Sequence, residues 1–239
     1  MEHLEFKNIV IVIPSFCPSD KLIQLVKSLK EKKLTPIVVV NDGSPASYDP
    51  IFEEAKSSGC LIIHSHQNMG KGDALKKGIK FILEQVNSAS HILCCDDDGQ
   101  HSPQDILKVA QYAINHKCPF ILGVRNFDLH TPFKSLIGNL IVNRLLSLML
   151  LTRITDSQTG LRCYDRNIAT NLLHIKGNRF SFETSSLIHL LRSNLKPIEI
   201  SISTIYFSNN QDTRFKIWRD SYQILKTLLV SSTLKSGEK

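Results

Sequence analysis

Three consecutive carboxylates follow a run of six residues that is suited to a buried strand. The run is residues 90–95 (SHILCC), and Asp96, Asp97 and Asp98 come directly after it. Adjacent like charges repel, and a carboxylate is costly to remove from water without a counter-charge. A divalent cation supplies that charge and prefers oxygen ligands. Asp96 and Asp98 therefore predict a metal site at a strand end, where α/β sheets bind ligands, with a solvated acidic turn as the alternative.

Apolar runs and helical spacing alternate five times in the first half of the chain. The strands predicted from apolar runs are residues 8–14, 36–40, 60–64, 90–95 and 119–124, each separated from the next by a helical pattern. Such alternation with short connections predicts an α/β fold with a mostly parallel central sheet and helices on both faces. Because the loops at Asp42, at residues 68–72 and at residues 96–98 all follow strands, we expect them to gather along one edge of the sheet.

Charge is distributed unevenly over the 239 residues, whose net charge is +7. Residues 1–124 hold 13 Lys and Arg against 14 Asp and Glu, a net charge of −1, whereas residues 125–239 hold 16 against 8, a net charge of +8. A basic second half favours a polyanionic partner such as a phosphate group or an anionic membrane surface. Nucleic acid is not expected, because the chain has no arginine-rich run and no aromatic-basic repeat.

Cysteine usage and hydropathy bear on where the chain resides. The six cysteines form no C-x-x-C pair, which fits a reduced, cytoplasmic environment, and residues 1–5 do not resemble a signal peptide. The longest apolar stretch, residues 136–151, is interrupted by Asn143 and Arg144 and is too short and polar to cross a bilayer. This helix is either an element that lies in a membrane interface or a core helix. We expect one domain over residues 1–239, peripheral at the cytoplasmic face of a membrane.

Four motifs occur in an order that is known from one enzyme family. They are residues 40–44 (VNDGS), 68–72 (NMGKG), 96–103 (DDDGQHSP) and 156–162 (DSQTGLR). In these motifs the chain resembles the inverting family 2 glycosyltransferases of the GT-A fold, and within them the dolichol-phosphate mannose synthase and polyprenyl-phosphate glycosyltransferase branch. The resemblance implies a part that binds the nucleotide sugar, at about residues 8–125, and a part that binds the acceptor, at about residues 126–231.

The resemblance also implies roles for individual residues on the donor side. The residues expected to bind the nucleotide sugar are Pro14, Asp42, Lys71, Asp96 and Asp97, and those expected to hold Mg²⁺ or Mn²⁺ on the diphosphate are Asp96, Asp98 and Gln100. The loop around Lys71 is equally compatible with a tight strand–helix turn. Asn41 stands where the family has an acid, and residues 17–20 replace the family's Asn-Glu. The choice between UDP and GDP therefore stays open.

The acceptor side depends on the ionisation of the nucleophile. A polyprenyl phosphate is already ionised at neutral pH, so it needs cations to hold it in line rather than a strong base. The candidate cations are Arg125, Arg144, Arg162 and Arg214, and the candidate catalytic residues are Asp98, Arg125, Asp156 and Glu183. A saccharide hydroxyl acceptor would instead require a base, for which Asp156 and Glu183 are the candidates.

The sequence therefore predicts a metal-dependent inverting glycosyltransferase that moves a hexose from a nucleotide-diphosphate sugar to a polyprenyl phosphate. The first alternative is the same chemistry on a saccharide hydroxyl in surface polysaccharide or glycolipid synthesis. The second is a nucleotide-sugar-binding protein without catalysis. A nucleotidyltransferase is not favoured, because residues 15–18 (SFCP) lack the glycine-rich, basic loop that such enzymes place after the first strand.

Overall fold

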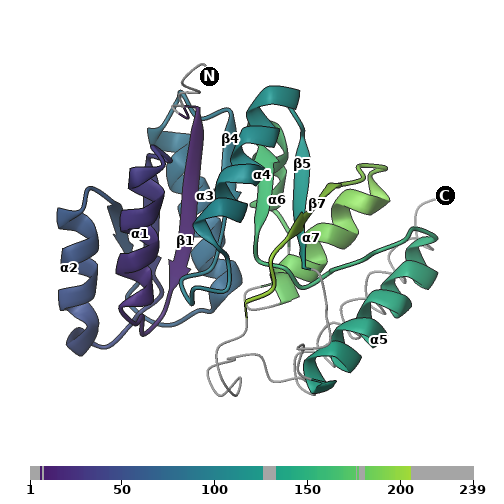
Figure 1. The fold of residues 1–239 in the computed structure, drawn as a ribbon, viewed down its shortest axis with the longest axis horizontal. Helices are drawn as coiled ribbons and strands as arrows, with labels where there is room; N and C mark the ends of the chain where they lie inside the picture. The colour runs from purple at the N-terminus through teal and green to yellow at the C-terminus, as the bar shows by residue number, and fades with distance from the viewer. Residues whose placement is uncertain (1–5, 7, 126–132, 176, 178–180, 206–239) are drawn as a thin grey trace.

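The computed structural model describes residue 6 and residues 8–125, 133–175, 177 and 181–205 (Figure 1). The strands in chain order are β1 (Ile9–Ser15), β2 (Ile37–Asn41), β3 (Leu61–His64), β4 (His91–Cys94), β5 (Phe120–Arg125), β6 (Arg162–Asp165) and β7 (Ile198–Ile202). The helices are α1 (Lys21–Glu31), α2 (Asp49–Ser57), α3 (Lys71–Gln85), α4 (Pro103–His116), α5 (Phe133–Leu150), α6 (Arg166–Leu172) and α7 (Ser181–Arg192), with a 3-10 turn η1 (Ala46–Tyr48).

The described strands form one mixed sheet in the order β3-β2-β1-β4-β6-β5-β7. All neighbouring strands are parallel except β6, which runs antiparallel to both β4 and β5. The predicted mostly parallel sheet is therefore confirmed. Strand β6 and helix α6 were not predicted, because the short segment of residues 162–165 (RCYD) has neither a long apolar run nor a clear alternation.

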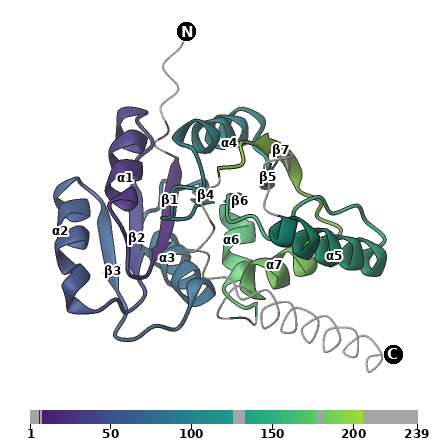
Figure 2. The same cartoon turned by 60° about the horizontal axis from the view of Figure 1, so that its bottom comes forward.

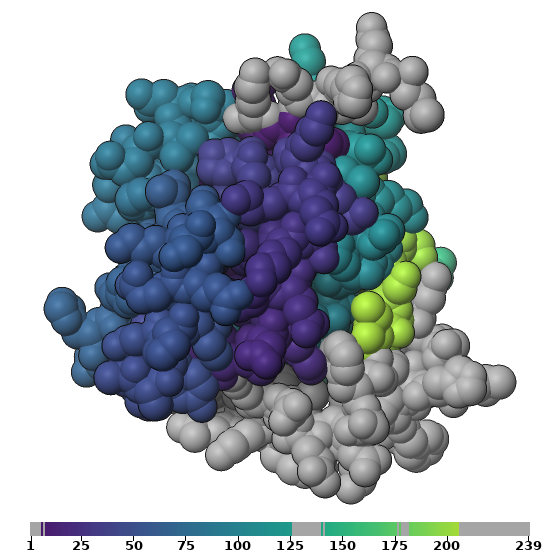
Figure 3. Space-filling model, turned by 60° about the vertical axis from the view of Figure 1, so that its left-hand side comes forward, coloured from purple at the N-terminus to yellow at the C-terminus, as the bar shows by residue number. Residues whose placement is uncertain are grey.

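Helices cover both faces of the sheet, as predicted. In β1, Ile11 and Ile13 pack with the apolar residues of α1, α2 and α4, whereas Val10 and Val12 pack with those of α3, α5, α6 and α7. Because successive side chains of a strand point to opposite faces, one continuous apolar strand supplies both layers of the core. Figure 2 shows α1 and α3 on opposite faces of the sheet. Figure 3 shows α1 and α2 side by side on the same face.

The loops at the carboxyl ends of the parallel strands gather at one edge of the sheet. Asp42 follows β2, and its carboxylate accepts hydrogen bonds from the backbone N–H groups of Met69 and Gly70, at 3.1 and 2.7 Å. A Cβ atom on Gly43 would lie 2.4 Å from the carbonyl carbon of Gln67, so only glycine permits this approach of two backbones. The predicted convergence of these loops is confirmed, and Asp42 and Gly43 hold it in place.

Candidate active site

The loop after β4 carries Asp96, Asp97 and Asp98, and a hydrogen bond holds each of these three residues in place. The hydroxyl of Ser15 at the end of β1 donates to Asp97 Oδ2 at 2.5 Å. The backbone N–H of Gln100 donates to Asp98 Oδ1 at 2.9 Å, and that of Asp96 donates to His101 Nδ1 at 3.1 Å. The loop is therefore held from the neighbouring strand β1 and from within, which presents Asp96 and Asp98 together at the sheet edge.

Lys71 links the acidic loop to the second half of the chain. Its Nζ atom lies 2.5 Å from Asp96 Oδ1 and 2.8 Å from Glu183 Oε1. Burial would lower the pKa of the Lys71 ammonium, but the two carboxylates hold that pKa above its ordinary value. Burial would likewise raise the pKa of the Asp96 carboxyl, but Lys71 and His101 hold it below its ordinary value. Asp96 is therefore ionised and paired in the site.

Asp98 is in a different electrostatic situation from Asp96. Burial raises the pKa of the Asp98 carboxyl, and the neighbouring charge of Asp96 raises it further, while the hydrogen bond from Gln100 opposes this. A pair of carboxylates in which one is disfavoured by the other is a suitable place for a cation. Within the described part of the chain, however, no group of three or more His, Cys, Asp and Glu side chains could hold a metal.

These residues fit a divalent metal of one particular kind. Mg²⁺ is commonly bound by one or two protein carboxylates together with the phosphate oxygens of a substrate. Asp96 and Asp98 supply the two carboxylates, and the backbone N–H of Gln100 donates to one of them, Asp98 Oδ1, while the Gln100 side chain stays a predicted metal ligand. The donor set is therefore suited to a metal that arrives with a diphosphate.

Two residues predicted for the donor site have structural roles. Pro14 is buried in β1, where it pairs with Val40 of β2. Asp42 is only 2% exposed, and both of its carboxylate oxygens accept bonds from the loop before α3. Asp42 thus holds the loop before α3, and the predicted contacts of Pro14 and Asp42 with the nucleotide stay predictions. The sequence reveals an acid after a strand but not the loop that folds back onto it.

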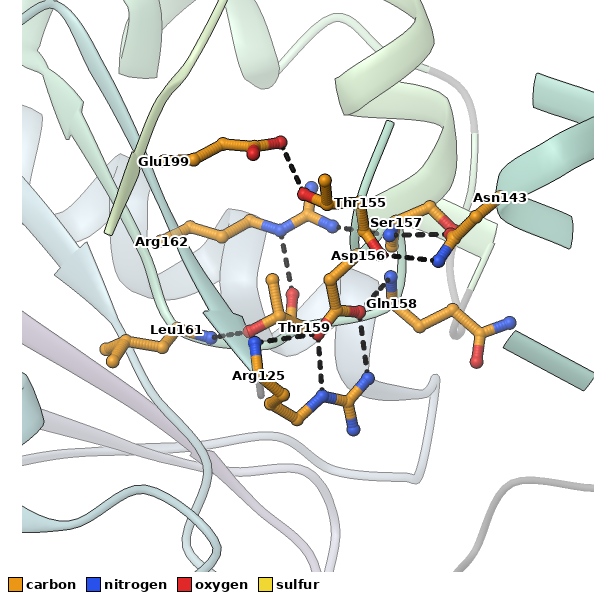
Figure 4. Close-up of polar contacts among 10 residues, drawn as sticks. All are labelled: Arg125, Asn143, Thr155, Asp156, Ser157, Gln158, Thr159, Leu161, Arg162 and Glu199. Carbon is orange, nitrogen blue, oxygen red and sulfur yellow. Dashed lines mark hydrogen bonds and ion pairs between the residues drawn. The ribbon is translucent and has the colours of Figure 1, made fainter. Parts of the chain in front are cut away.

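Arg125, the last residue of β5, forms a bidentate ion pair with Asp156. Its Nε atom donates to Asp156 Oδ2 at 2.7 Å and its Nη2 atom to Oδ1 at 2.9 Å (Figure 4). Asp156 is fully buried, whereas the Arg125 side chain is 18% exposed. Such a fork fixes the plane and direction of the guanidinium. Asp156 therefore orients Arg125 and is not available as an unpaired base in this arrangement.

The segment that contains Asp156 is held from α5 and from β6. The Asn143 side chain donates to the carbonyl of Thr155 and accepts from the backbone and hydroxyl of Ser157, at 2.6–2.9 Å. Arg162, at the start of β6, donates to the carbonyls of Ser157 and Thr159, both at 2.9 Å (Figure 4). Residues 155–161 are therefore an ordered wall of the site, which we call the β6 loop.

The structure corrects the role that the sequence predicts for Arg162. It was expected to bind an acceptor phosphate, but it is 2% exposed and its guanidinium is used by protein acceptors. Arg144 is exposed on α5, and Arg214 lies outside the described residues. Of the three predicted cations that the structure describes, Arg125 is the one placed beside the carboxylates. Sequence reasoning missed Asn143 as a site residue, although a polar side chain within an apolar helix was a usable signal.

Gly160 in the β6 loop contacts Asp96 directly, which gives a testable consequence. A Cβ atom on Gly160 would lie 2.4 Å from Asp96 Oδ2 and 2.8 Å from Oδ1. We expect Gly160→Ala to displace the carboxylate from Lys71 and to lower turnover about 100-fold, since a misplacement of about 1 Å can cost that much. Steady-state kinetics and thermal unfolding of the variant measure both effects.

Gly78→Ala is the matched control, because its Cβ atom would lie 2.6 Å from Val12 Cγ1 in the core rather than in the site. We expect it to lower the midpoint of thermal unfolding while turnover per folded molecule stays within about threefold of the native value. Equal turnover losses in the two variants would show that Gly160 matters for stability alone.

A half-buried acidic loop, a lysine that joins it to a second carboxylate and an oriented arginine lie together at the carboxyl ends of the strands, an arrangement suited to a phosphorylated ligand. In its fold the chain is similar to glucosyl-3-phosphoglycerate synthase of Mycobacterium tuberculosis, crystallised with Mn²⁺, UDP and glucosyl-3-phosphoglycerate. That match has a TM-score of 0.72 at 16% identity and covers 93% of this chain and 79% of the other. The predicted GT-A fold is confirmed.

The family follows from the sequence comparison. Residues 10–173 match the model of glycosyl transferase family 2, and the chain belongs to that family. It is 32% identical to an uncharacterized protein of Methanocaldococcus jannaschii over 83% of this chain and 82% of the other. It is 28% identical to the UDP-N-acetylglucosamine–dolichyl-phosphate N-acetylglucosaminyltransferase of Methanococcus voltae, over 84% and 86%. The resemblance to polyprenyl-phosphate glycosyltransferases is thus confirmed, and the chain is a glycosyltransferase rather than a binding protein without catalysis.

Proposed function

We propose that this glycosyltransferase moves a sugar, with inversion, from a UDP-sugar to a polyprenyl phosphate and that it depends on Mg²⁺ or Mn²⁺. The observation that supports the proposal is the ion pair of Arg125 with Asp156, because it orients a cation and engages a carboxylate that a hydroxyl acceptor would need as a base. The carboxylate of Glu183 is likewise engaged by Lys71. An acceptor phosphate brings its own negative charge and needs no base.

Each residue of the site has its own role in the proposed reaction. Asp96 and Asp98 would hold the metal on the diphosphate, and that metal would stabilise the negative charge of the leaving group. Lys71, between Asp96 and Glu183, supplies a further positive charge beside the diphosphate. Arg125 orients the acceptor phosphate in line with the anomeric carbon. Holding the two reactants in that geometry is a large part of the rate enhancement that enzymes achieve.

Relatives of this chain support the choice of substrates. The Methanococcus voltae relative is named for UDP-N-acetylglucosamine and dolichyl phosphate. A Dictyostelium discoideum relative, 24% identical over 74% of this chain and 57% of its own length, is named a dolichyl-phosphate β-glucosyltransferase. We therefore propose a uridine donor and a polyprenyl acceptor, with a GDP-sugar or a saccharide hydroxyl as the alternatives.

Thermal unfolding with UDP or GDP, each with and without Mn²⁺, tests the donor and the metal. A ligand at about 100 times its dissociation constant adds roughly 2.7 kcal/mol to the free energy of unfolding. For a chain of this size we expect a rise of about 5–11 °C in the midpoint. The proposal predicts this rise with UDP and Mn²⁺ together and little with either alone. A rise with GDP instead of UDP would correct the donor, and no rise with either would contradict the donor site.

We further propose that helix α5 meets the membrane in which a polyprenyl phosphate resides. No described helix is long and apolar enough to cross a membrane. Leu140 and Leu148 on α5 and Leu151 just after it are 60%, 69% and 94% exposed. With the exposed Arg144 they follow helical spacing along one face, whereas Val142 on the same helix is buried. An apolar face with a cation favours an anionic lipid surface.

Charged substitutions on α5 test this proposal. We expect Leu140→Glu with Leu148→Glu to weaken sedimentation with vesicles that contain anionic phospholipid at least about tenfold, because each leucine contributes about 1.5–3 kcal/mol on burial. Leu61→Glu is the control, since Leu61 is 42% exposed but lies on the edge strand β3. Equal vesicle binding by the native protein and the α5 variant would contradict a role of α5 at the membrane.

A further inference from the structure

Arg162 is the largest fully buried side chain of the described residues, and it is charged. Burying a guanidinium is costly unless hydrogen bonds compensate for the lost water. Here the compensating hydrogen bonds are made to backbone carbonyls, to the hydroxyl of Ser186 and to the side chain of Tyr164. An arginine that is used in this way fixes backbone positions, because its rigid fork sets the direction of each bond.

The guanidinium joins two segments that are distant in the sequence. On one side, Nε and Nη2 donate to the carbonyls of Thr159 and Ser157 in the β6 loop, both at 2.9 Å. On the other side, Nη1 donates to the carbonyl of Glu183 at 2.6 Å and to Ser186 Oγ at 3.2 Å, both in α7. Arg162 is therefore a direct bridge between the β6 loop and the first turns of α7.

Both segments are linked by contacts to the carboxylate of Asp96. In the β6 loop, Gly160 lies directly against the carboxylate of Asp96, as the blocked Cβ position shows. In α7, the side chain of Glu183 contacts Lys71, which in turn contacts Asp96. The contacts thus form a closed ring from Arg162 through the loop to Asp96 and back through Lys71 and Glu183. A change at Arg162 would be transmitted to Asp96 from two directions.

We propose that Arg162 is a positioning residue for sugar transfer, which holds the β6 loop and α7 at the separation that seats Asp96 between Gly160 and Lys71. The same contacts to Ser157 and Thr159 flank Asp156, so Arg162 also supports the orientation of Arg125. The catalytic part of this inference rests on the proposed function. Arg162 itself has no role as a ligand of the acceptor phosphate.

The chain offers a matched control in Arg166, four residues further on. Arg166 also donates to three backbone carbonyls, those of Leu83, Val86 and Ala89, at 2.5–3.2 Å. These acceptors lie at the end of α3 and in the turn before β4, whereas the acidic loop follows the other end of β4. Arg162→Lys and Arg166→Lys therefore remove the same kind of fork, one beside the site and one away from it.

The first measurement compares the kinetics and stability of the two variants. We expect Arg162→Lys to lower kcat at least about 30-fold while KM for the donor changes less than about threefold. We expect Arg166→Lys to lower the midpoint of thermal unfolding by a similar amount but to keep kcat within about threefold of the native value. Equal effects on kcat in the two variants, or a native kcat in Arg162→Lys, would overturn the proposal.

The second measurement does not depend on activity. Amide hydrogen exchange of Arg162→Lys should lose at least about tenfold protection both in residues 155–161 and in residues 181–186, whereas Arg166→Lys should change neither segment. Unchanged exchange in either segment would overturn the bridge. If the native protein transfers no sugar, the proposed function fails, and the exchange result still decides whether Arg162 fastens the two segments together.

Discussion

Asp98→Asn is expected to lower kcat for sugar transfer about 1,000-fold without lowering the midpoint of thermal unfolding. The substitution removes one of two carboxylates that would hold the metal, whose stabilisation of the leaving group is worth several kcal/mol, and about 1.4 kcal/mol corresponds to tenfold in rate. Stability should be retained or should rise slightly, because Asp96 and burial both disfavour the charge of Asp98. Kinetics at saturating Mn²⁺ and thermal unfolding in its absence measure the two effects.

Glu54→Gln is the control for Asp98→Asn, since it removes a carboxylate from an exposed ion pair that joins Lys27 of α1 to Glu54 of α2. It should leave both kcat and the unfolding midpoint close to their native values. If Asp98→Asn retained more than about a tenth of the native kcat, Asp98 would not be a metal ligand in catalysis, and the metal proposal would have to move to other residues.

Asp156→Asn is expected to lower both activity and stability. Its carboxylate is fully buried and paired at 2.7 Å with Arg125, and removal of one partner from a buried ion pair costs about 3–5 kcal/mol. At roughly 2–4 °C for each kcal/mol, the unfolding midpoint should fall by about 6–20 °C. Loss of the orientation of Arg125 should reduce kcat/KM for the acceptor at least about 100-fold.

A double-mutant cycle separates pairing from base catalysis. If Asp156 acts only by orienting Arg125, then Arg125→Met and Asp156→Asn should cause similar losses of kcat/KM, and the double variant should lose little more than either single variant. If Asp156 is instead the base for a hydroxyl acceptor, Asp156→Asn should abolish transfer while Arg125→Met retains most of it. The second result would replace the polyprenyl phosphate with a saccharide acceptor.

Local patterns were sufficient to predict most of the fold and the position of the acidic loop. Apolar runs gave the strands β1 to β5, and α4 begins at Pro103 directly after Ser102, whose Oγ accepts the N–H of Asp105. These signals are local, because they depend on a continuous apolar run and on the free N–H groups of a helix start. The end of a strand is also where a polar ligand-binding loop is expected.

The errors concern contacts between segments that are distant in the sequence. Arg162 was placed with the acceptor because a phosphate needs cations, and nothing in its sequence neighbours reveals that the antiparallel strand β6 buries it. The contacts of Asp42 with the loop before α3 were likewise not predicted, because the two segments are about 27 residues apart. The contact of Lys71 with Glu183 depends on the packing of α3 against α7, which no motif contains.

The most direct test of the central claim is a transfer assay with the purified protein. A radiolabelled sugar is supplied as UDP-N-acetylglucosamine, UDP-glucose or GDP-mannose, with a polyprenyl phosphate and with Mn²⁺ or a chelator. We predict that the label of a UDP-sugar moves into the organic phase only with Mn²⁺, and that the product has the inverted anomeric configuration by NMR. Label that moves to a saccharide hydroxyl while the polyprenyl phosphate stays unmodified, or transfer that is unaffected by the chelator, would contradict the proposed function.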